Sequence, residues 1–456
     1  MSRDLAPRRA PFLLLTAASA AGLFFLYFFG LTRTGLVGPD EPRYAAIGRA
    51  MAATGDWITP RLWGQTWFEK PALLYWMTAA GFKAGLGAEL APRLPVALAS
   101  VAFLAYFFVV LRREFGDRAA WYSATILATS VGWLAYSHVA ITDLPMSAAF
   151  AAAMLAIFSS EPRGLTSGLV AGALLGLAVL AKGLVPLALF IPALWFLRHS
   201  IRDLALVFGA ATLVAAPWYV LVTLRNGMPF LDEFIWKQHF GRFLNSALQH
   251  QQPVWFYVPV LLAGLFPWTP LLGLLFKRRL YHDHRALFLL VWFAWGFLFF
   301  SASRNKLPGY LLPLLPPLAA LMGVALAGGG RARVLLAASG AILGGVAMIA
   351  GALPQALLTG FSRASFRLTF FWIIVGAAIA VTCALLDRAR QRDLAVTLLA
   401  LAMVISVVSL VWRVYPELDR QVSGRTAGSM TCVPAMSRSQ RYSIDYYASR
   451  NLPDCN

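Results

Sequence analysis

The stretch FLLLTAASAAGLFFLYFFGL, from Phe12 to Leu31, is a run of 20 almost entirely apolar residues near the start of the chain. An α-helix of about 20 apolar residues crosses the hydrocarbon core of a bilayer, which is roughly 30 Å thick. The basic start and the Ala18-Ser19-Ala20 triplet also fit a cleavable signal peptide. Because the apolar run continues well past that triplet, we expect an uncleaved first span, with a signal peptide as the alternative.

The rest of the chain repeats this pattern. Its 456 residues are 59% hydrophobic and 13% charged, with a mean hydropathy of +0.67, whereas soluble domains are about 45–50% apolar and about 25% charged. Thirteen candidate spans are at Phe12–Leu31, Leu94–Leu111, Ala119–Ser137, Ile141–Phe158, Leu165–Leu180, Leu184–Leu197, Leu204–Leu224, Val254–Phe276, Ala286–Phe300, Leu307–Leu326, Val334–Ala352, Thr369–Leu386 and Leu394–Val411. The expected fold class is an all-α polytopic membrane protein.

The charge pattern predicts the topology. The net charge of +19 is spread over short loops without a basic block, which argues against nucleic-acid binding. If the N-terminus is cytoplasmic, the inside loops are all short and basic, as the positive-inside rule requires. The transmembrane domain then covers 1–411, and the loops 32–93 and 225–253 and the tail 412–456 face the outside.

The three cysteines fit this topology. Cys383 lies in an apolar run and is expected to pack as a small hydrophobe. Cys432 and Cys455 both lie in the tail, so a disulfide between them is expected if the tail faces an oxidising compartment.

The first long loop is more than a linker. DEPRYAAIGRAMAATGDW, starting at Asp40, has a proline in its first turn, then helix formers, and the predicted helix ends at Gly55. KPALLYWMTAAGFKAGLG, starting at Lys70, is apolar and aromatic but short for a span. Both segments are predicted to be interfacial helices that lie over the outer mouth of the protein.

Ionisable and polar side chains gather at the outer ends of the predicted spans. Such groups are costly at membrane depth and are functional candidates by default. Positive charge on the side that the insertion rule disfavours suggests a bound anion. The candidates are Asp40, Glu41, Arg43, Glu69, Lys70, Asp143, Lys182, His239, Arg242, Arg304, Lys306 and Tyr310.

Several candidates also have structural interpretations. Asp40 could simply cap the helix that follows it. Glu69 and Lys70 could form a solvated interfacial pair. Lys182 could extend its amine to the membrane surface, and His239 could be an ordinary hydrogen-bonded loop residue.

The order of short motifs resembles that of a known group of proteins. The motifs are DEPRY (40–44), FEKP (68–71), ITDLPM (141–146), AKGLVP (181–186), HFGRF (239–243) and KLPGYLLP (306–313). In this order they resemble the bacterial aminoarabinose transferase and protein O-mannosyltransferase group, which are membrane glycosyltransferases of the GT-C type. The resemblance runs through about residues 12–325.

The resemblance implies transfer of a sugar from a polyprenyl-phosphate carrier to a lipid or glycan acceptor such as lipid A, at the outer side of the membrane. It also implies that this membrane is a bacterial inner membrane, so that the active site and the tail face the periplasm. The catalytic carboxylate is expected to be Asp40, with Glu41 as either a helper or a helix-start residue. The cations are expected to hold the donor phosphate. The expected roles are: catalytic, Asp40, Glu41 and Asp143; donor phosphate, Lys70, Arg242, Arg43, Lys306 and Tyr310; a possible divalent metal (Zn, Mg or Mn), Glu69 and His239; a further cavity position, Lys182.

The tail limits what the resemblance implies. Aminoarabinose transferases carry a larger soluble domain after the last span, so lipid A is a lead for the acceptor, and the sugar is left open. A transporter or lipid flippase is the main alternative, although the chain has no convincing internal repeat and its ionisable groups cluster at one face. A structural or assembly membrane protein is a third interpretation, which would leave the acid–base cluster unexplained.

Overall fold

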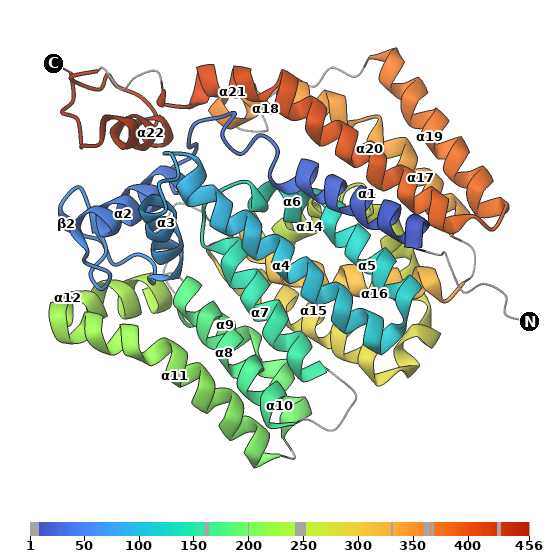
Figure 1. The fold of residues 1–456 in the computed structure, drawn as a ribbon, viewed down its shortest axis with the longest axis horizontal. Helices are drawn as coiled ribbons and strands as arrows, with labels where there is room; N and C mark the ends of the chain where they lie inside the picture. Colours follow the sequence, from blue (N-terminus) through green and yellow to red (C-terminus); the bar gives the residue numbers. More distant parts are fainter. Residues whose placement is uncertain are drawn as a thin grey trace, which may run out of the picture.

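The computed structural model describes residues 9–158, 164–198, 200–241, 252–329, 332–359, 365, 369–425 and 430–455. Apart from one short hairpin, the regular structure in these residues is helical (Figure 1). The α-helices are α1 (Arg9–Tyr27), α2 (Glu41–Thr54), α3 (Leu73–Lys83), α4 (Leu90–Phe115), α5 (Asp117–Thr129), α6 (Val131–Ser137), α7 (Asp143–Phe158), α8 (Leu165–Lys182), α9 (Val185–Leu189), α10 (Ile191–Leu197), α11 (Ile201–Asn226), α12 (Met228–Leu231), α14 (Tyr257–Gly264), α15 (His284–Ala302), α16 (Leu315–Ala327), α17 (Arg333–Leu343), α18 (Val346–Thr359), α19 (Phe370–Arg388), α20 (Arg392–Arg413), α21 (Tyr415–Val422) and α22 (Arg438–Ala448). A π-helical segment η1 (Asp232–Gly241) and the 3-10 segments η2 (Val254–Phe256), η3 (Thr269–Phe276), η4 (Arg278–His282) and η5 (Pro308–Leu314) complete the helical elements.

Seven helices in the described residues are long and apolar enough to cross a bilayer, and a bent pair raises the number to eight. The predicted count of thirteen is therefore not confirmed, although a helix lies within every predicted span. Several predicted spans are interrupted: Ser130 separates α5 from α6, and Phe190 separates α9 from α10. The segment Val254–Phe276 bends by 110° between α14 and η3. Hydropathy detects the apolar run but does not detect these breaks.

The core is built around α16 and α7. In the span Pro308–Ala327, 83% of the most apolar window is buried inside the protein, against 11% in Phe370–Arg388. The side chains of α7 are almost all buried. The peripheral helices expose large apolar side chains, which is what a lipid-facing surface requires, because a bilayer solvates them as well as a protein core does.

One end of the bundle carries the predicted interfacial helices. Figure 1 shows α2, α3 and the hairpin at this end, with α22 next to α2 and α12 below α3. Both predicted helices of the first loop are present, as α2 and α3. The first loop therefore forms a folded platform at one end of the membrane helices.

The hairpin between α2 and α3 was not predicted. Its strands β1 (Arg61–Leu62) and β2 (Gln65–Thr66) are antiparallel, and Trp63 and Gly64 form the two-residue turn. Both turn residues have positive φ, 51° and 83°, which is the conformation that two-residue hairpin turns of type I′ need. Gly64 was the only sequence signal for this turn.

The described part of the tail is folded. Cys432 and Cys455 form a disulfide, as expected, and a parallel bridge joins Val433 to Asp454 next to it. Cys383 is buried and unpaired. The closed loop contains α22, which contacts α2.

Candidate functional site

A buried ion pair fixes the start of α2. Arg93, in the first turn of α4, donates from Nε to Glu41 Oε1 at 2.7 Å and from Nη2 to Glu41 Oε2 at 2.8 Å. The same carboxylate accepts backbone N–H bonds from Ala140 at 2.9 Å and from Val37 at 3.0 Å. The two charged side chains are 3% and 0% exposed, and each compensates a charge that would be costly to bury alone. Glu41 therefore joins the loop before α2 to α4 and to the turn before α7.

Arg93 also organises the chain that leads into α2. Its Nη1 donates to the carbonyls of Leu31 and Thr34, both at 2.7 Å, and its Nη2 donates to the carbonyl of Gly35 at 2.9 Å. A planar guanidinium presents five donors in a fixed geometry, so one side chain holds the whole loop. These bonds fix the position of Asp40, which lies at the end of this loop.

Arg43 binds the other two acidic side chains of this region, Asp40 and Glu69. Its Nη1 donates to Glu69 at 2.8 Å, its Nη2 donates to Asp40, and its Nε donates to the carbonyl of Pro39 at 2.7 Å. Burial alone would lower the pKa of Arg43, but the facing carboxylates, Glu69 before Asp40, raise it above its ordinary value. The guanidinium is therefore a permanent cation whose three nitrogen positions are all engaged by the protein.

Asp40 remains accessible. Its side chain is 43% exposed, whereas that of Arg43 is 4% exposed. Asp40 occupies the N-cap position of α2 but makes no side-chain capping bond, so the interpretation of Asp40 as a helix cap is wrong. A carboxylate held on one side by a buried cation and open on the other can meet a substrate in a fixed position.

Glu69 and Lys70 follow the hairpin and lie beside Arg43. Lys70 Nζ is 3.6 Å from Glu69 Oε1, and the two side chains are only 13% and 12% exposed. This is not the solvated surface pair that the sequence allowed as an alternative. The cation of Lys70 is instead held in a mostly buried position next to the Asp40 region.

The possible metal stays a prediction. The side chain of His239 and all of Arg242 lie outside the described residues. Within the described residues, no group of three or more His, Cys, Asp or Glu side chains could hold a metal ion. Both oxygens of Glu69 face cations, Arg43 and Lys70, so a divalent cation would have to compete with them. We therefore derive no step through a metal.

A second charged cluster lies where α7 begins and α8 ends. Lys182 donates to Asp143 Oδ1 at 2.6 Å, and the two side chains are 10% and 16% exposed. The Lys182 ammonium also lies 4.5 Å from the ring centre of Tyr310. The sequence allowed Lys182 as a cation that reaches the membrane surface; the structure pairs it inside the protein.

Gly309 and Tyr136 complete this cluster. A Cβ at Gly309 would lie 2.5 Å from Asp143 Oδ1 and 2.7 Å from the ring of Tyr136, so only glycine fits here without a shift. The Tyr136 side chain and Asp143 both lie against Gly309. Asp143, one of the three carboxylates predicted to be catalytic, thus lies beside a phenol as well as beside Lys182.

The tail places an aromatic ring beside the Arg43 guanidinium. The ring of Tyr442 on α22 lies 5.1 Å from the Arg43 guanidinium. The helix is anchored by Ser443 Oγ, which donates to the carbonyl of Leu36 at 2.7 Å, and by the Tyr446 hydroxyl, which donates to the carbonyl of Ala88 at 2.6 Å. The end of the chain therefore packs directly against the first loop.

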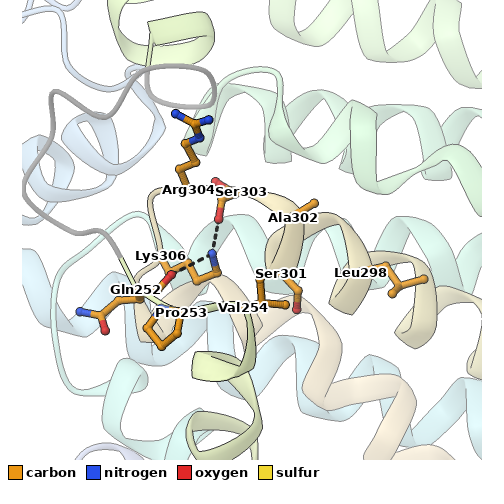
Figure 2. Close-up of a pocket in the computed structure, with 9 residues that line it drawn as sticks. All are labelled: Gln252, Pro253, Val254, Leu298, Ser301, Ala302, Ser303, Arg304 and Lys306. Carbon is orange, nitrogen blue, oxygen red and sulfur yellow. Dashed lines mark hydrogen bonds between the residues drawn. The ribbon is translucent and has the colours of Figure 1, made fainter.

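Three residues of the site, Arg93, Tyr136 and Tyr442, were not singled out from the sequence. Arg93 carried a usable signal, because it is an arginine at the start of a predicted span. Tyr136 lies a few positions before a motif but inside an apolar run, and Tyr442 lies in an aromatic, basic tail with no motif. Lys306 was predicted, but it faces a separate pocket (Figure 2).

Known protein families and solved structures include clear relatives of this chain. A family model described as dolichyl-phosphate-mannose-protein mannosyltransferase matches residues 69–222. An undecaprenyl phosphate-alpha-4-amino-4-deoxy-L-arabinose arabinosyl transferase of Erwinia tasmaniensis is 30% identical over 387 residues, which cover 78% of this chain and 70% of that protein. The chain belongs to the aminoarabinose transferase family. The resemblance seen in the motifs is thereby confirmed.

Two further comparisons support membership of the aminoarabinose transferase family. The enzyme of the same name from Pseudomonas aeruginosa strain LESB58 is 35% identical over 325 residues. The match covers 67% of this chain but only 58% of that relative's length. The crystal structure of ArnT from Cupriavidus metallidurans bound to undecaprenyl phosphate matches with a TM-score of 0.75 and 27% identity, covering 97% of this chain and 86% of that one. The predicted GT-C fold of a multi-pass bacterial membrane protein is confirmed.

Proposed function

We propose that this protein transfers a sugar from a polyprenyl-phosphate donor, of the undecaprenyl-phosphate type, to a lipid or glycan acceptor such as lipid A. The observation that carries the proposal is Asp40, an accessible carboxylate that a buried arginine holds beside the Glu69–Lys70 pair. The names of the relatives support the reaction class, and the similarity to ArnT bound to undecaprenyl phosphate supports the donor class.

In this mechanism Asp40 acts as a general base. The acceptor hydroxyl gives its proton to the Asp40 carboxylate as its oxygen attacks the anomeric carbon of the sugar. The bond between that carbon and the phosphate oxygen breaks, and polyprenyl phosphate leaves with an added negative charge. Lys70, with Tyr310 and Arg242, is proposed to stabilise that charge, which a cation does best where water is scarce.

The remaining predicted residues are proposed to act through these groups. Glu41 is saturated by Arg93 and two backbone amides, so we assign it the helix-start role rather than that of a helper base. Arg43 is proposed to position Asp40 rather than bind phosphate itself, because each of its three nitrogens already donates to the protein. Asp143 holds Lys182 against Tyr310.

We propose that the site and the tail face the periplasm of the inner membrane and that the N-terminus is cytoplasmic. The Cys432–Cys455 disulfide supports this orientation, since disulfides persist in oxidising compartments. The tail that carries it packs on the loop that carries Asp40. Both elements must therefore lie on the same side of the membrane.

The test is a transfer assay with the purified chain in vesicles. Wild type is incubated with a panel of polyprenyl-phosphate sugars and with lipid A, other glycolipids and glycans as acceptors. We expect one donor–acceptor pair to react, and Asp40→Asn to reduce the rate by about 10²-fold or more, the scale of a lost general base. Asp117→Asn, which changes an exposed acid of α5, is the matched control. Movement of a substrate across vesicles without sugar transfer from any donor would favour a transporter instead.

A further inference from the structure

Lys306 differs from the other buried cations at this end of the molecule. Arg93 and Lys182 each pair with a carboxylate. Lys306 is 4% exposed, and its amine donates to the backbone carbonyls of Ser303 and of Gln252, the latter at 3.3 Å. Within the described parts of the chain, no carboxylate lies at ion-pair distance from it. A buried ammonium with no acidic partner is costly and indicates a place for an anion.

The electrostatics of Lys306 agree with this interpretation. Burial lowers the pKa of the ammonium, because the charged form loses water. An ammonium has three N–H donors, and the two carbonyl contacts use two of them. A bound anion would accept from the third and would favour the charged form.

Lys306 lines a pocket of about 590 Å³ (Figure 2). Ligand pockets in proteins are typically about 300–1,000 Å³. The walls come from the end of α15, the loop after it and the segment that precedes η2. The lining residues are Gln252, Pro253, Val254, Leu298, Ser301, Ala302, Ser303, Arg304 and Lys306. The lining contains two cations and no acid.

Two further polar groups in this pocket are available to a ligand. Arg304 is exposed and makes no hydrogen bond or ion pair with the residues that the structure describes. The Ser301 hydroxyl is buried, with the residue 8% exposed, and it too has no partner among the described residues. Buried polar groups are almost always hydrogen-bonded, so this hydroxyl in the pocket wall offers a ligand a second polar contact beside the ammonium.

One side of the pocket wall is apolar. Leu298 is 65% exposed and Val254 is 73% exposed, and both lie at the ends of apolar helical segments. Exposed apolar side chains in a membrane protein face acyl chains. The pocket therefore combines a cationic end with an apolar side, which is the pattern that an amphiphile with an anionic head group requires.

We propose that Lys306 and Arg304 form an anion subsite, separate from the proposed donor-phosphate site at Lys70, that binds the phosphate head group of a membrane lipid. Lys70, Asp143, Lys182 and Tyr310 are not among the residues that line the pocket. The head group could come from the polyprenyl carrier or from an anionic phospholipid; both present a phosphate next to hydrocarbon. The subsite does not depend on the transfer reaction, so it is tested by binding.

The experiment uses the full chain, depleted of lipid in detergent. Binding of phosphatidylglycerol, undecaprenyl phosphate, zwitterionic phosphatidylcholine and inorganic phosphate is measured by thermal shift and by native mass spectrometry. We expect wild type to bind the anionic lipids, and Lys306→Gln to weaken that binding by about tenfold, because a hydrogen bond to a charged group is lost. Arg304→Gln should weaken binding less, because Arg304 is exposed.

Additional variants distinguish the two possible sources of the phosphate head group and serve as controls for misfolding. In the Lys70→Gln background the donor site is weakened, so undecaprenyl phosphate that still binds through Lys306 identifies the carrier as an occupant. Phosphatidylglycerol that depends on Lys306 in the same way identifies a phospholipid. Arg304→Gln alters an exposed side chain that has no partner in the described parts of the chain, and it should fold normally even if Lys306→Gln does not. Arg61→Gln removes an exposed charge elsewhere and should change nothing.

Equal retention of the anionic lipids by wild type, Lys306→Gln and Arg304→Gln would overturn the inference. Equal binding of phosphatidylcholine would also overturn it. So would binding of inorganic phosphate by a protein that binds neither anionic lipid. None of these results would bear on the proposed function, because that proposal fails only if no donor sugar is transferred.

Discussion

The ring of Tyr442, on the last helix of the chain, lies 5.1 Å from the guanidinium of Arg43, in the first turn of α2. Arg43 in turn holds Asp40 and Glu69. An aromatic face attracts a guanidinium and limits where it can move. A tail residue therefore acts on the proposed catalytic carboxylate through one arginine.

We expect Tyr442→Ala to lower kcat by about tenfold with little change in the KM for the donor, on the scale of a cation–π contact of about 1–2 kcal/mol. Tyr442→Phe keeps the ring face and should restore the rate. Transfer kinetics measure both variants, and electrophoresis with and without reductant checks that the tail disulfide still forms. If Tyr442→Phe is as impaired as Tyr442→Ala, the hydroxyl rather than the ring face is responsible.

Arg43→Lys should lower kcat by about 10²-fold, although the charge is kept. A lysine ammonium cannot reproduce the fork that reaches Asp40, Glu69 and the carbonyl of Pro39 together. Small misplacements of a catalytic group have effects of about this size. Single-turnover transfer rates measure the effect, with Arg61→Lys on the exposed hairpin as the matched control. A rate within about twofold of wild type would contradict the positioning role, since a misplaced base costs far more than that.

The motifs located the candidate site, but the sequence could not assign every role. Charged residues in an apolar chain are conspicuous, so Asp40, Asp143 and Lys182 were found from position alone. The partner of each charge is a property of packing. Glu41 and Asp40 are adjacent in sequence, yet one is saturated by Arg93 and the other is exposed.

For the fold, too, some features could be predicted from the sequence and others could not. Hydropathy found the apolar segments and the interfacial helices, because burial in lipid requires apolar surface. It could not find the breaks at Ser130 and Phe190 or the 110° bend, since a local turn leaves the composition unchanged. The separation of Lys306 from the cluster around the nearby Tyr310 is also a consequence of packing.

Glu41→Gln should destabilise the protein by about 3–5 kcal/mol, because it leaves the buried Arg93 without its counter-charge. The double variant Glu41→Gln/Arg93→Met removes both charges and should recover part of that loss. Thermal unfolding in detergent measures wild type and both variants, together with Arg93→Met alone. Additive losses in the double variant would show that the two side chains are not coupled.

Gly309→Ala tests the cluster around Asp143. The new Cβ would lie 2.5 Å from Asp143 Oδ1, closer than side-chain atoms tolerate, so the carboxylate that holds Lys182 must move. We expect kcat to fall by about 10²-fold, on the scale of a small misplacement in an active site, while the protein remains folded. Gly209→Ala, on α11, meets no atom within 4 Å and should leave transfer unchanged. Lys182→Met should produce a loss similar to that of Gly309→Ala, and combining the two should add little, since both act on the same ion pair. Full activity in Gly309→Ala would mean that the geometry of the Asp143–Lys182 pair does not matter for transfer.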